Sequence, residues 1–154
     1  MLREYVMVKP HNAWFQFATP YINIKRCIMK TINSLNELEL PTKHKIFLEV
    51  FIDNARKINN ANKIERLILF GSCARGEAIN KSDIDIIALG TELDDNILGD
   101  LYYCAPEPDS GFYVENDIII MTTELYNKNK YTYGMLQKYI EQDGVDISGL
   151  LQFS

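Results

Sequence analysis

Residues 67–89, LILFGSCARGEAINKSDIDIIAL, decide the fold that this sequence predicts. An apolar run ends in Gly71-Ser72, and ten residues separate the serine from Asp83 and Asp85, which stand on either side of one isoleucine. In the strand expected over residues 83–89, alternate side chains point the same way, so the two carboxylates share one face. Like charges at partly buried positions repel each other, and the pattern therefore indicates a positively charged partner.

A divalent cation and a phosphate group would satisfy both halves of this stretch. Mg²⁺ favours one or two carboxylates together with substrate phosphates, and no lysine or arginine alternates with Asp83 and Asp85 along the strand. Gly71-Ser72, where a buried strand turns into a short helix, offers backbone N–H groups and a hydroxyl to phosphate oxygens. The alternative for the two aspartates is a solvent-facing strand with ordinary polar alternation. The Gly-Ser turn at a fixed distance before them favours a metal and phosphate site.

The rest of the chain predicts an α+β (mixed α/β) protein. Apolar periodicity indicates helices first and then strands interleaved with helices. The helices are expected over residues 20–38, from Thr42 to about residue 58, around residues 93–101, and around residues 136–140 before Gly144, and the strands over residues 64–70, 83–89 and 112–122. With 154 residues the chain is long enough for one compact domain, in which a helical N-terminal extension (1–60) packs on a core (61–154).

Composition excludes several classes of protein. A hydrophobic content of 47% argues against disorder, and the apolar runs are too short to span a membrane. The three cysteines have no CxxC spacing, which argues against a zinc site and for reduced thiols in a cytoplasm. The net charge of −5 makes polymeric nucleic acid an unfavourable partner. His44 stands between two lysines near a helix start and is expected in solvent.

The string LFGSCARGEA followed by SDIDI resembles the signature of the DNA polymerase β nucleotidyltransferase superfamily, and is similar to its minimal nucleotidyltransferase branch. The resemblance implies a small mixed sheet backed by helices and a third carboxylate on a neighbouring strand. Asp117 fits that position best, although Glu115 shares its face. The implied metal ligands and catalytic residues are then Asp83, Asp85 and Asp117. Gly71, Ser72 and Arg75 would bind the nucleotide, but Arg75 could equally pair with Glu77 or a strand carboxylate.

The resemblance also implies the chemistry. Two Mg²⁺ ions, or Mn²⁺ in their place, would orient a nucleoside triphosphate, with ATP favoured, so that an acceptor hydroxyl attacks its α-phosphorus and pyrophosphate leaves. Within this branch the acceptors include a tyrosine on a separate HEPN-type toxin, which would make the transferase an antitoxin, and the hydroxyls of aminoglycosides. A catalytically silent module that binds a nucleotide or a partner is the alternative. The sequence leaves the acceptor, the base preference and the oligomeric state open.

Overall fold

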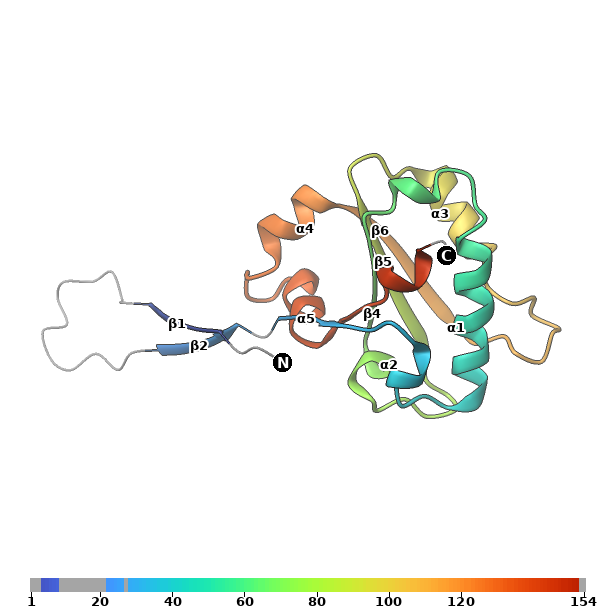
Figure 1. Cartoon of the computed structure of the whole chain (residues 1–154), viewed down its shortest axis with the longest axis horizontal. Coiled ribbons are helices and arrows are strands. Elements are labelled where there is room, and N and C mark those ends of the chain that lie inside the picture. The colour runs from blue at the N-terminus through green and yellow to red at the C-terminus, as the bar shows by residue number, and fades with distance from the viewer. Residues whose placement is uncertain (1–3, 9–21, 27, 153–154) are drawn as a thin grey trace, which may run out of the picture.

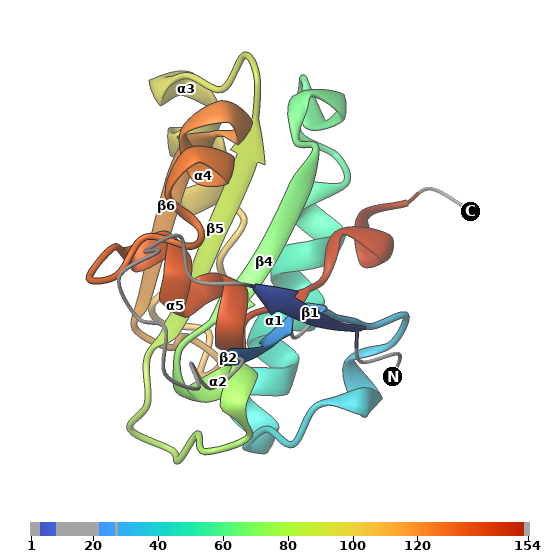
Figure 2. The same cartoon turned by 90° about the vertical axis from the view of Figure 1, so that its left-hand side faces the viewer.

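A five-stranded mixed sheet with helices on both faces forms the body of the protein (Figures 1 and 2). The computed structural model describes residues 4–8, 22–26 and 28–152. The strands of this sheet are β3 (Lys30–Thr31), β4 (Arg66–Phe70), β5 (Ile84–Gly90), β6 (Asn116–Thr122) and β7 (Val145–Asp146). The α-helices are α1 (Thr42–Ala55), α2 (Ser72–Arg75), α3 (Asp95–Tyr102), α4 (Thr123–Asn129) and α5 (Leu136–Asp143). Short 3₁₀ helices occupy Leu35–Glu37, Ala61–Lys63 and Ser148–Leu151. The predicted α+β class, with a small mixed sheet backed by helices, is confirmed.

The strand order is β3-β7-β4-β5-β6. β4 pairs antiparallel with β5, and β5 pairs parallel with β6 through a connection that contains α3. Parallel neighbours need such a crossover, whereas the antiparallel β4 and β5 are joined through α2 and a short loop. The central strand β5 is therefore paired along both edges, which explains why six of its seven residues are buried.

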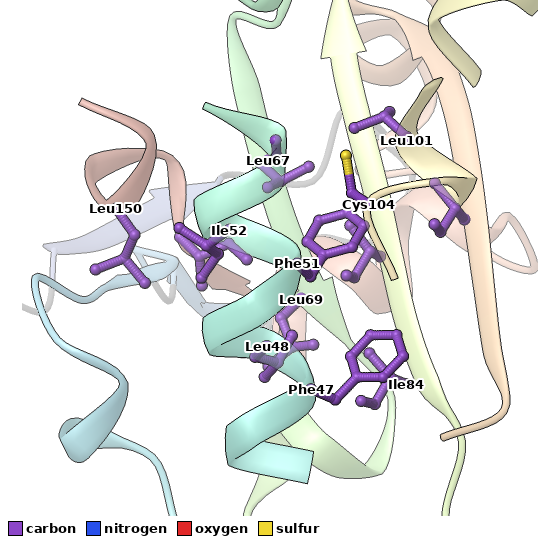
Figure 3. Packing of buried hydrophobic residues seen from close by; sticks show 14 of the residues in the cluster. Phe47, Leu48, Phe51, Ile52, Leu67, Leu69, Ile84, Leu101, Cys104 and Leu150 are labelled. Atoms are coloured by element: carbon purple, nitrogen blue, oxygen red, sulfur yellow. The ribbon is translucent and has the colours of Figure 1, made fainter. Parts of the chain in front are cut away.

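The two faces of the sheet bury two separate apolar clusters. The larger contains Phe47 and Phe51 of α1, which stack with their ring centroids 6.3 Å apart, together with Ile84 of β5 (Figure 3). Ile86 of the same strand belongs to this cluster as well. The smaller lies on the opposite face, where Ile87 and Leu89 meet residues of α4 and α5. Because successive strand residues point to opposite faces, the continuous apolar run of β5 serves both clusters.

Helix α1 buries one face against the larger cluster. Its buried side chains recur at helical spacing and are His44, Phe47, Leu48, Phe51, Ile52 and Ala55. The prediction of a helix here is confirmed, with its end at Ala55 and not near residue 58. The prediction that His44 is solvated is wrong, since its exposed fraction is 0%. The proposed boundary between residues 60 and 61 stays a prediction.

The helix expected over residues 20–38 is not formed. Residues Ile22–Arg26 form β2, which pairs antiparallel with β1 (Glu4–Val8) in a separate two-stranded sheet. Lys30–Thr31 form β3, and a 3₁₀ turn follows with a capping box between Ser34 and Glu37. β-branched isoleucine and threonine tolerate extended backbone well, and pairing with β7 outweighed the helical spacing of the isoleucines. The predicted cap at Thr19-Pro20 lies outside the described residues.

The remaining predicted elements are present with adjusted bounds. Strands β4, β5 and β6 occupy the three predicted strand regions, although β6 begins at Asn116 and not at residue 112. Helices α3 and α5 confirm the two later helices, and Gly144 follows the end of α5 as predicted. The analysis of periodicity missed α4, which begins directly after β6 with a Thr122 side chain that accepts the Leu125 N–H. None of the helices in the described residues has the length and apolar character that crossing a lipid bilayer requires.

We expect Phe51→Ala to lower the free energy of unfolding by about 3–5 kcal/mol, because it removes a fully buried ring and its stacking partner cannot fill the space. Urea unfolding followed by circular dichroism measures the change. Phe112→Ala is the matched control, since that ring is 44% exposed, and it should cost much less. A loss below about 1 kcal/mol for Phe51→Ala would contradict the assignment of the larger cluster as the main core.

Candidate functional site

Three aspartates gather where β5 and β6 begin. Asp85 lies directly opposite Asp117 in the parallel pairing of β5 with β6. Asp83 precedes the first residue of β5 and is two residues from Asp85, so extended backbone places both on one face. Partners in adjacent strands are about 4.8 Å apart at their Cα atoms. The fold therefore brings together the three side chains that the sequence analysis assigned to catalysis, from two segments about thirty residues apart.

The carboxylates continue a row of side chains whose far end is buried. Ile87 and Leu89 share the face of Asp85 and lie in the smaller cluster beneath α4 and α5. Asp85 is half-buried, whereas Asp83 and Asp117 are exposed. The burial thus falls off along this face toward the start of β5. A ligand can approach the three carboxylates from solvent while Asp85 remains anchored in the sheet.

Burial and like charge both act on Asp85. The pKa of its carboxyl group is raised, first by burial, then by the negative charges of Asp117 and Asp83, while Arg75 opposes the shift. The effect shows that the three carboxylates feel one another electrostatically. Ionisation of Asp85 is therefore costlier in the folded chain than in water.

Gly71 approaches the Asp85 carboxylate more closely than any other residue type could. Its backbone has φ +72° and ψ −155°, a conformation that L-residues with a side chain rarely adopt. A Cβ atom on Gly71 would meet Asp85 Oδ2 at 2.4 Å. The glycine is therefore required both for the turn from β4 into α2 and for the space that Asp85 occupies. Ser72 follows as the first residue of α2.

The turn before Asp83 is fixed by buried groups. His44 Nε2 lies 2.7 Å from the carbonyl oxygen of Ser82, and the Cys73 thiol donates to the carbonyl oxygen of Asp83 at 3.4 Å. The Ser82 hydroxyl accepts the Ile79 N–H at 2.9 Å, so Ser82 forms the turn hydrogen bond that its position suggested. Burial, reinforced by Asp85, raises the pKa of the Cys73 thiol to about 11, which keeps it a hydrogen-bond donor.

Arg75 lies on the same short helix but is held by a neighbour. Its Nε donates to Glu77 Oε2 at 2.9 Å, and both side chains are largely exposed. That hydrogen bond raises the pKa of Arg75, and the negative charges of Asp143 and Asp85 raise it further. Of the alternatives open for Arg75, the ligand-free structure has the pair with Glu77. An exposed pair of this kind is weak, so Arg75 can exchange Glu77 for a phosphate.

A polar cleft of about 260 Å³ adjoins Asp83. Lys43 of α1, Lys81 and Glu115 contribute to its walls, and Tyr113 lines it as well. Neither lysine has an ion-pair partner among the residues that the structure describes. Asp83 and Glu115 line the same cleft, which therefore carries two positively and two negatively charged side chains. The sequence analysis did not identify this feature, because Lys43 is 40 residues from Asp83 in the chain.

The donor set suits Mg²⁺, which prefers carboxylate oxygens, and three carboxylates on one face can supply it. In the described ranges, however, no three His, Cys, Asp or Glu side chains converge closely enough to form a metal cluster. Asp83 and Asp117 are exposed and have room to turn toward Asp85. The three carboxylates are therefore the right kind of ligand for Mg²⁺, but Asp83 and Asp117 would have to move closer to Asp85 to bind one ion together.

The strand register places the two candidates for the third carboxylate differently, and which of them is a ligand stays a prediction. Asp117 is the direct partner of Asp85, whereas the Glu115 carbonyl accepts the Ile84 N–H at 2.9 Å and its side chain lines the cleft beside Asp83. Sequence analysis missed the part of His44 in the site. The spacing from His44 to Phe47 and Leu48 was the signal that could have placed it on the buried face of α1.

Comparison with known families agrees with this site. Residues 54–105 match the family described as polymerase beta, nucleotidyltransferase. The match includes Gly71-Ser72, Asp83 and Asp85, and it ends before β6 and Asp117. No curated protein matches the chain.

We expect Gly71→Ala to cost about 2–4 kcal/mol of folding free energy, since it adds strain at positive φ and a clash with Asp85. Gly111→Ala is the matched control, because Gly111 also has positive φ but a Cβ there would meet nothing within 4 Å. Chemical unfolding of both variants separates the two costs. Equal losses in the two variants would show that Gly71 does not closely approach Asp85.

In the absence of divalent cations, Asp85→Asn should stabilise the protein at pH 7, on the order of 1 kcal/mol or roughly 2–4 °C in Tm. The raised pKa of Asp85 means that its ionisation costs more in the folded chain than in the unfolded chain. That cost is complete above the raised pKa and is absent below the ordinary value of 3.8, where both states are protonated. Thermal melts from pH 3 to pH 8 should therefore show an advantage of the variant that disappears in acid. A variant less stable than the wild type at pH 7 would contradict the repulsion.

Proposed function

Since residues 54–105 belong to the polymerase β-like nucleotidyltransferase superfamily, we propose that the chain is a metal-dependent enzyme that transfers a nucleoside monophosphate to an acceptor hydroxyl. The family match supports a nucleotidyltransferase-type function in general. The proposal adds ATP as the donor, AMP as the transferred group and pyrophosphate as the product. The observation that carries it is the placement of Asp85 opposite Asp117, with Asp83 on the same face and Gly71 against the Asp85 carboxylate.

Asp83, Asp85 and Asp117 are the proposed ligands of Mg²⁺, which when bound would neutralise the triphosphate and make its α-phosphorus more electrophilic. The repulsion that raises the pKa of Asp85 supports this assignment, because the cation would relieve it. Mn²⁺ has similar preferences for oxygen ligands and could replace Mg²⁺. His44 and Cys73, which bind the carbonyl oxygens of Ser82 and Asp83, support the proposed ligand Asp83 from behind the site.

Residues around Gly71 are proposed to bind the β- and γ-phosphates. The Gly71 carbonyl accepts the N–H groups of Ala74 and Arg75, so those of Ser72 and Cys73 precede the helical hydrogen bonds of α2 and can face a phosphate. Arg75 would leave Glu77 for the same phosphates. Lys43 and Lys81 line the adjoining cleft together with Asp83 and Glu115, so that two ammonium groups are available there to contact an anionic ligand.

In the proposed reaction the acceptor oxygen attacks the α-phosphorus, and the bond from that phosphorus to the bridging oxygen of the pyrophosphate breaks. The electron pair of the broken bond leaves with the pyrophosphate. The proton of the acceptor hydroxyl passes to Asp117, which is exposed and therefore accessible to the acceptor. Gly71, Ser72 and Arg75 contribute by holding the leaving group, and most of the rate acceleration would come from orientation and charge.

Three acceptor or partner classes follow from the minimal nucleotidyltransferase branch, and each stays a proposal. A tyrosine of a separate HEPN-type toxin is favoured by the small size of the chain, and would make the protein an antitoxin. An aminoglycoside hydroxyl is a second class. A silent binding module of the same fold is the third. Mass spectrometry of each acceptor after incubation with MgATP distinguishes them, because AMP adds to the toxin, to the drug or to neither.

The proposal predicts a metal-dependent thermal shift. With one nucleoside triphosphate and Mg²⁺ at about 100 times the dissociation constant, the folded state should gain roughly 2.7 kcal/mol, or about 5–10 °C in Tm. The shift should require both components and should disappear in Asp83→Asn/Asp85→Asn, which removes two proposed ligands.

The control for this melt is Glu107→Gln/Asp109→Asn, which removes two exposed acids from a loop and should behave as the wild type. All four nucleoside triphosphates are compared, and the largest shift identifies the donor base. A wild-type protein that shows no shift with any of them would overturn the enzymatic proposal and leave a partner-binding module.

A further inference from the structure

We propose that His44 and Cys73 are positioning residues that aim the Asp83 carboxylate at the metal and triphosphate. The inference rests on the proposed function, because Asp83 is a metal ligand only in that proposal. It assigns a role in the reaction to two buried side chains, His44 of α1 and Cys73 of α2. Neither side chain is itself a proposed metal ligand.

Two peptide groups flank the Cα atom of Asp83, and buried side chains bind the carbonyl oxygens of both. The Ser82 carbonyl belongs to the preceding peptide and lies 2.7 Å from His44 Nε2. The Asp83 carbonyl belongs to the following peptide and accepts the Cys73 thiol at 3.4 Å. The orientation of these two peptide planes sets φ and ψ of Asp83. They therefore set the direction in which its side chain leaves the backbone.

The following peptide is also held from its other end. The Ile84 N–H, which belongs to the same peptide as the Asp83 carbonyl, donates to the Glu115 carbonyl at 2.9 Å. The peptide is thus fixed between α2 and the segment that leads into β6. Asp83 itself has an exposed side chain and precedes the first residue of β5, so strand pairing alone does not restrain it. Hydrogen bonds from His44 and Cys73, together with the one to Glu115, hold the peptide groups on either side of it.

Both donors come from rigid, buried positions. The exposed fraction of His44 is 0% and that of Cys73 is 1%, and both residues lie in helices that pack on the larger cluster. A carbonyl oxygen can only accept a hydrogen bond, so His44 Nε2 carries the hydrogen. The His44 Nδ1 atom is buried without a hydrogen-bond partner among the described residues. A buried polar ring with one unsatisfied nitrogen is costly, and its retention is explained if the other nitrogen is needed for function.

A comparable arrangement elsewhere in the molecule serves as an internal control. Cys104 is also 1% exposed, and its thiol donates to the Asp100 carbonyl at 3.2 Å. Asn54 of α1 donates to the Cys104 carbonyl at 3.1 Å. These two hydrogen bonds hold the end of α3 and the turn after it. Unlike those of His44 and Cys73 they do not flank one residue, and no proposed metal ligand lies on that turn. Substitutions there measure what the loss of such bonds costs in stability alone.

The test compares variants that remove a donor with variants that keep one. His44→Leu and Cys73→Ala remove the hydrogen bonds, whereas His44→Gln places an amide N–H near the former Nε2 and Cys73→Ser retains a hydroxyl donor. Cys104→Ala and Asn54→Leu are the matched controls. Binding of MgATP is measured by calorimetry and binding of Mn²⁺ alone by electron paramagnetic resonance, while Tm reports the stability of each variant.

His44→Leu and Cys73→Ala should weaken MgATP and Mn²⁺ binding about 10-fold or more, the range known for groups that orient metal ligands. His44→Gln and Cys73→Ser should recover most of this loss. The two controls should lower Tm comparably and leave both affinities unchanged.

Failure of the inference can be told apart from failure of the proposed function. If the wild type binds MgATP, Asp83→Asn abolishes binding, and all donor-removing variants bind as the wild type, then His44 and Cys73 are merely structural. If Cys104→Ala weakens binding as much as Cys73→Ala, the effect is one of stability and the inference is again overturned. If the wild type binds neither MgATP nor Mn²⁺, the proposed function fails and the positioning role with it.

Discussion

The packing of β5 between two apolar clusters is the interaction on which the rest of this structure depends, because it holds Asp85 half-buried beside Asp83 and Asp117. Asp85 is half-buried in the sheet, and its neighbours raise its pKa further. A group of this kind persists only where the surrounding structure holds it firmly, because an unconstrained backbone would release the carboxylates into water. Two apolar clusters, one on each face of β5, provide that support.

The support extends from the cores to the site in a short series of contacts. Helix α1 packs Phe47 and Phe51 on the sheet, and His44 of the same helix binds the turn before Asp83. Helix α2 begins after the Gly71 turn, and the thiol of its Cys73 donates a hydrogen bond to the Asp83 carbonyl in the same loop. The stability of the larger cluster therefore determines how well Asp83 is positioned. This arrangement lowers the stability of the fold, because burial and the nearby carboxylates raise the cost of ionising Asp85.

Local sequence predicted the central part of the fold well. The strands at β4, β5 and β6 were evident because apolar runs between turn residues have few other stable arrangements. The segment over residues 20–38 was misassigned, because isoleucines at helical spacing also suit strands, and pairing of β3 with β7 decided between them. His44 was placed in solvent because lysines flank it, whereas helical phase buries it with Phe47 and Leu48. Pairing and burial depend on distant partners, which no local window contains.

By itself, the sequence determined that two carboxylates share a strand face behind a Gly-Ser turn, because strand geometry fixes a period of two and glycine permits the turn. Only the tertiary structure decided that Asp117 stands beside Asp85, that Gly71 leaves room for that carboxylate, and that His44 and Cys73 hold the backbone of Asp83. The physical reason is the range of the interactions. Alternation and turns arise from neighbouring residues, whereas the register between strands and the burial of a side chain arise when segments far apart in the chain pack together.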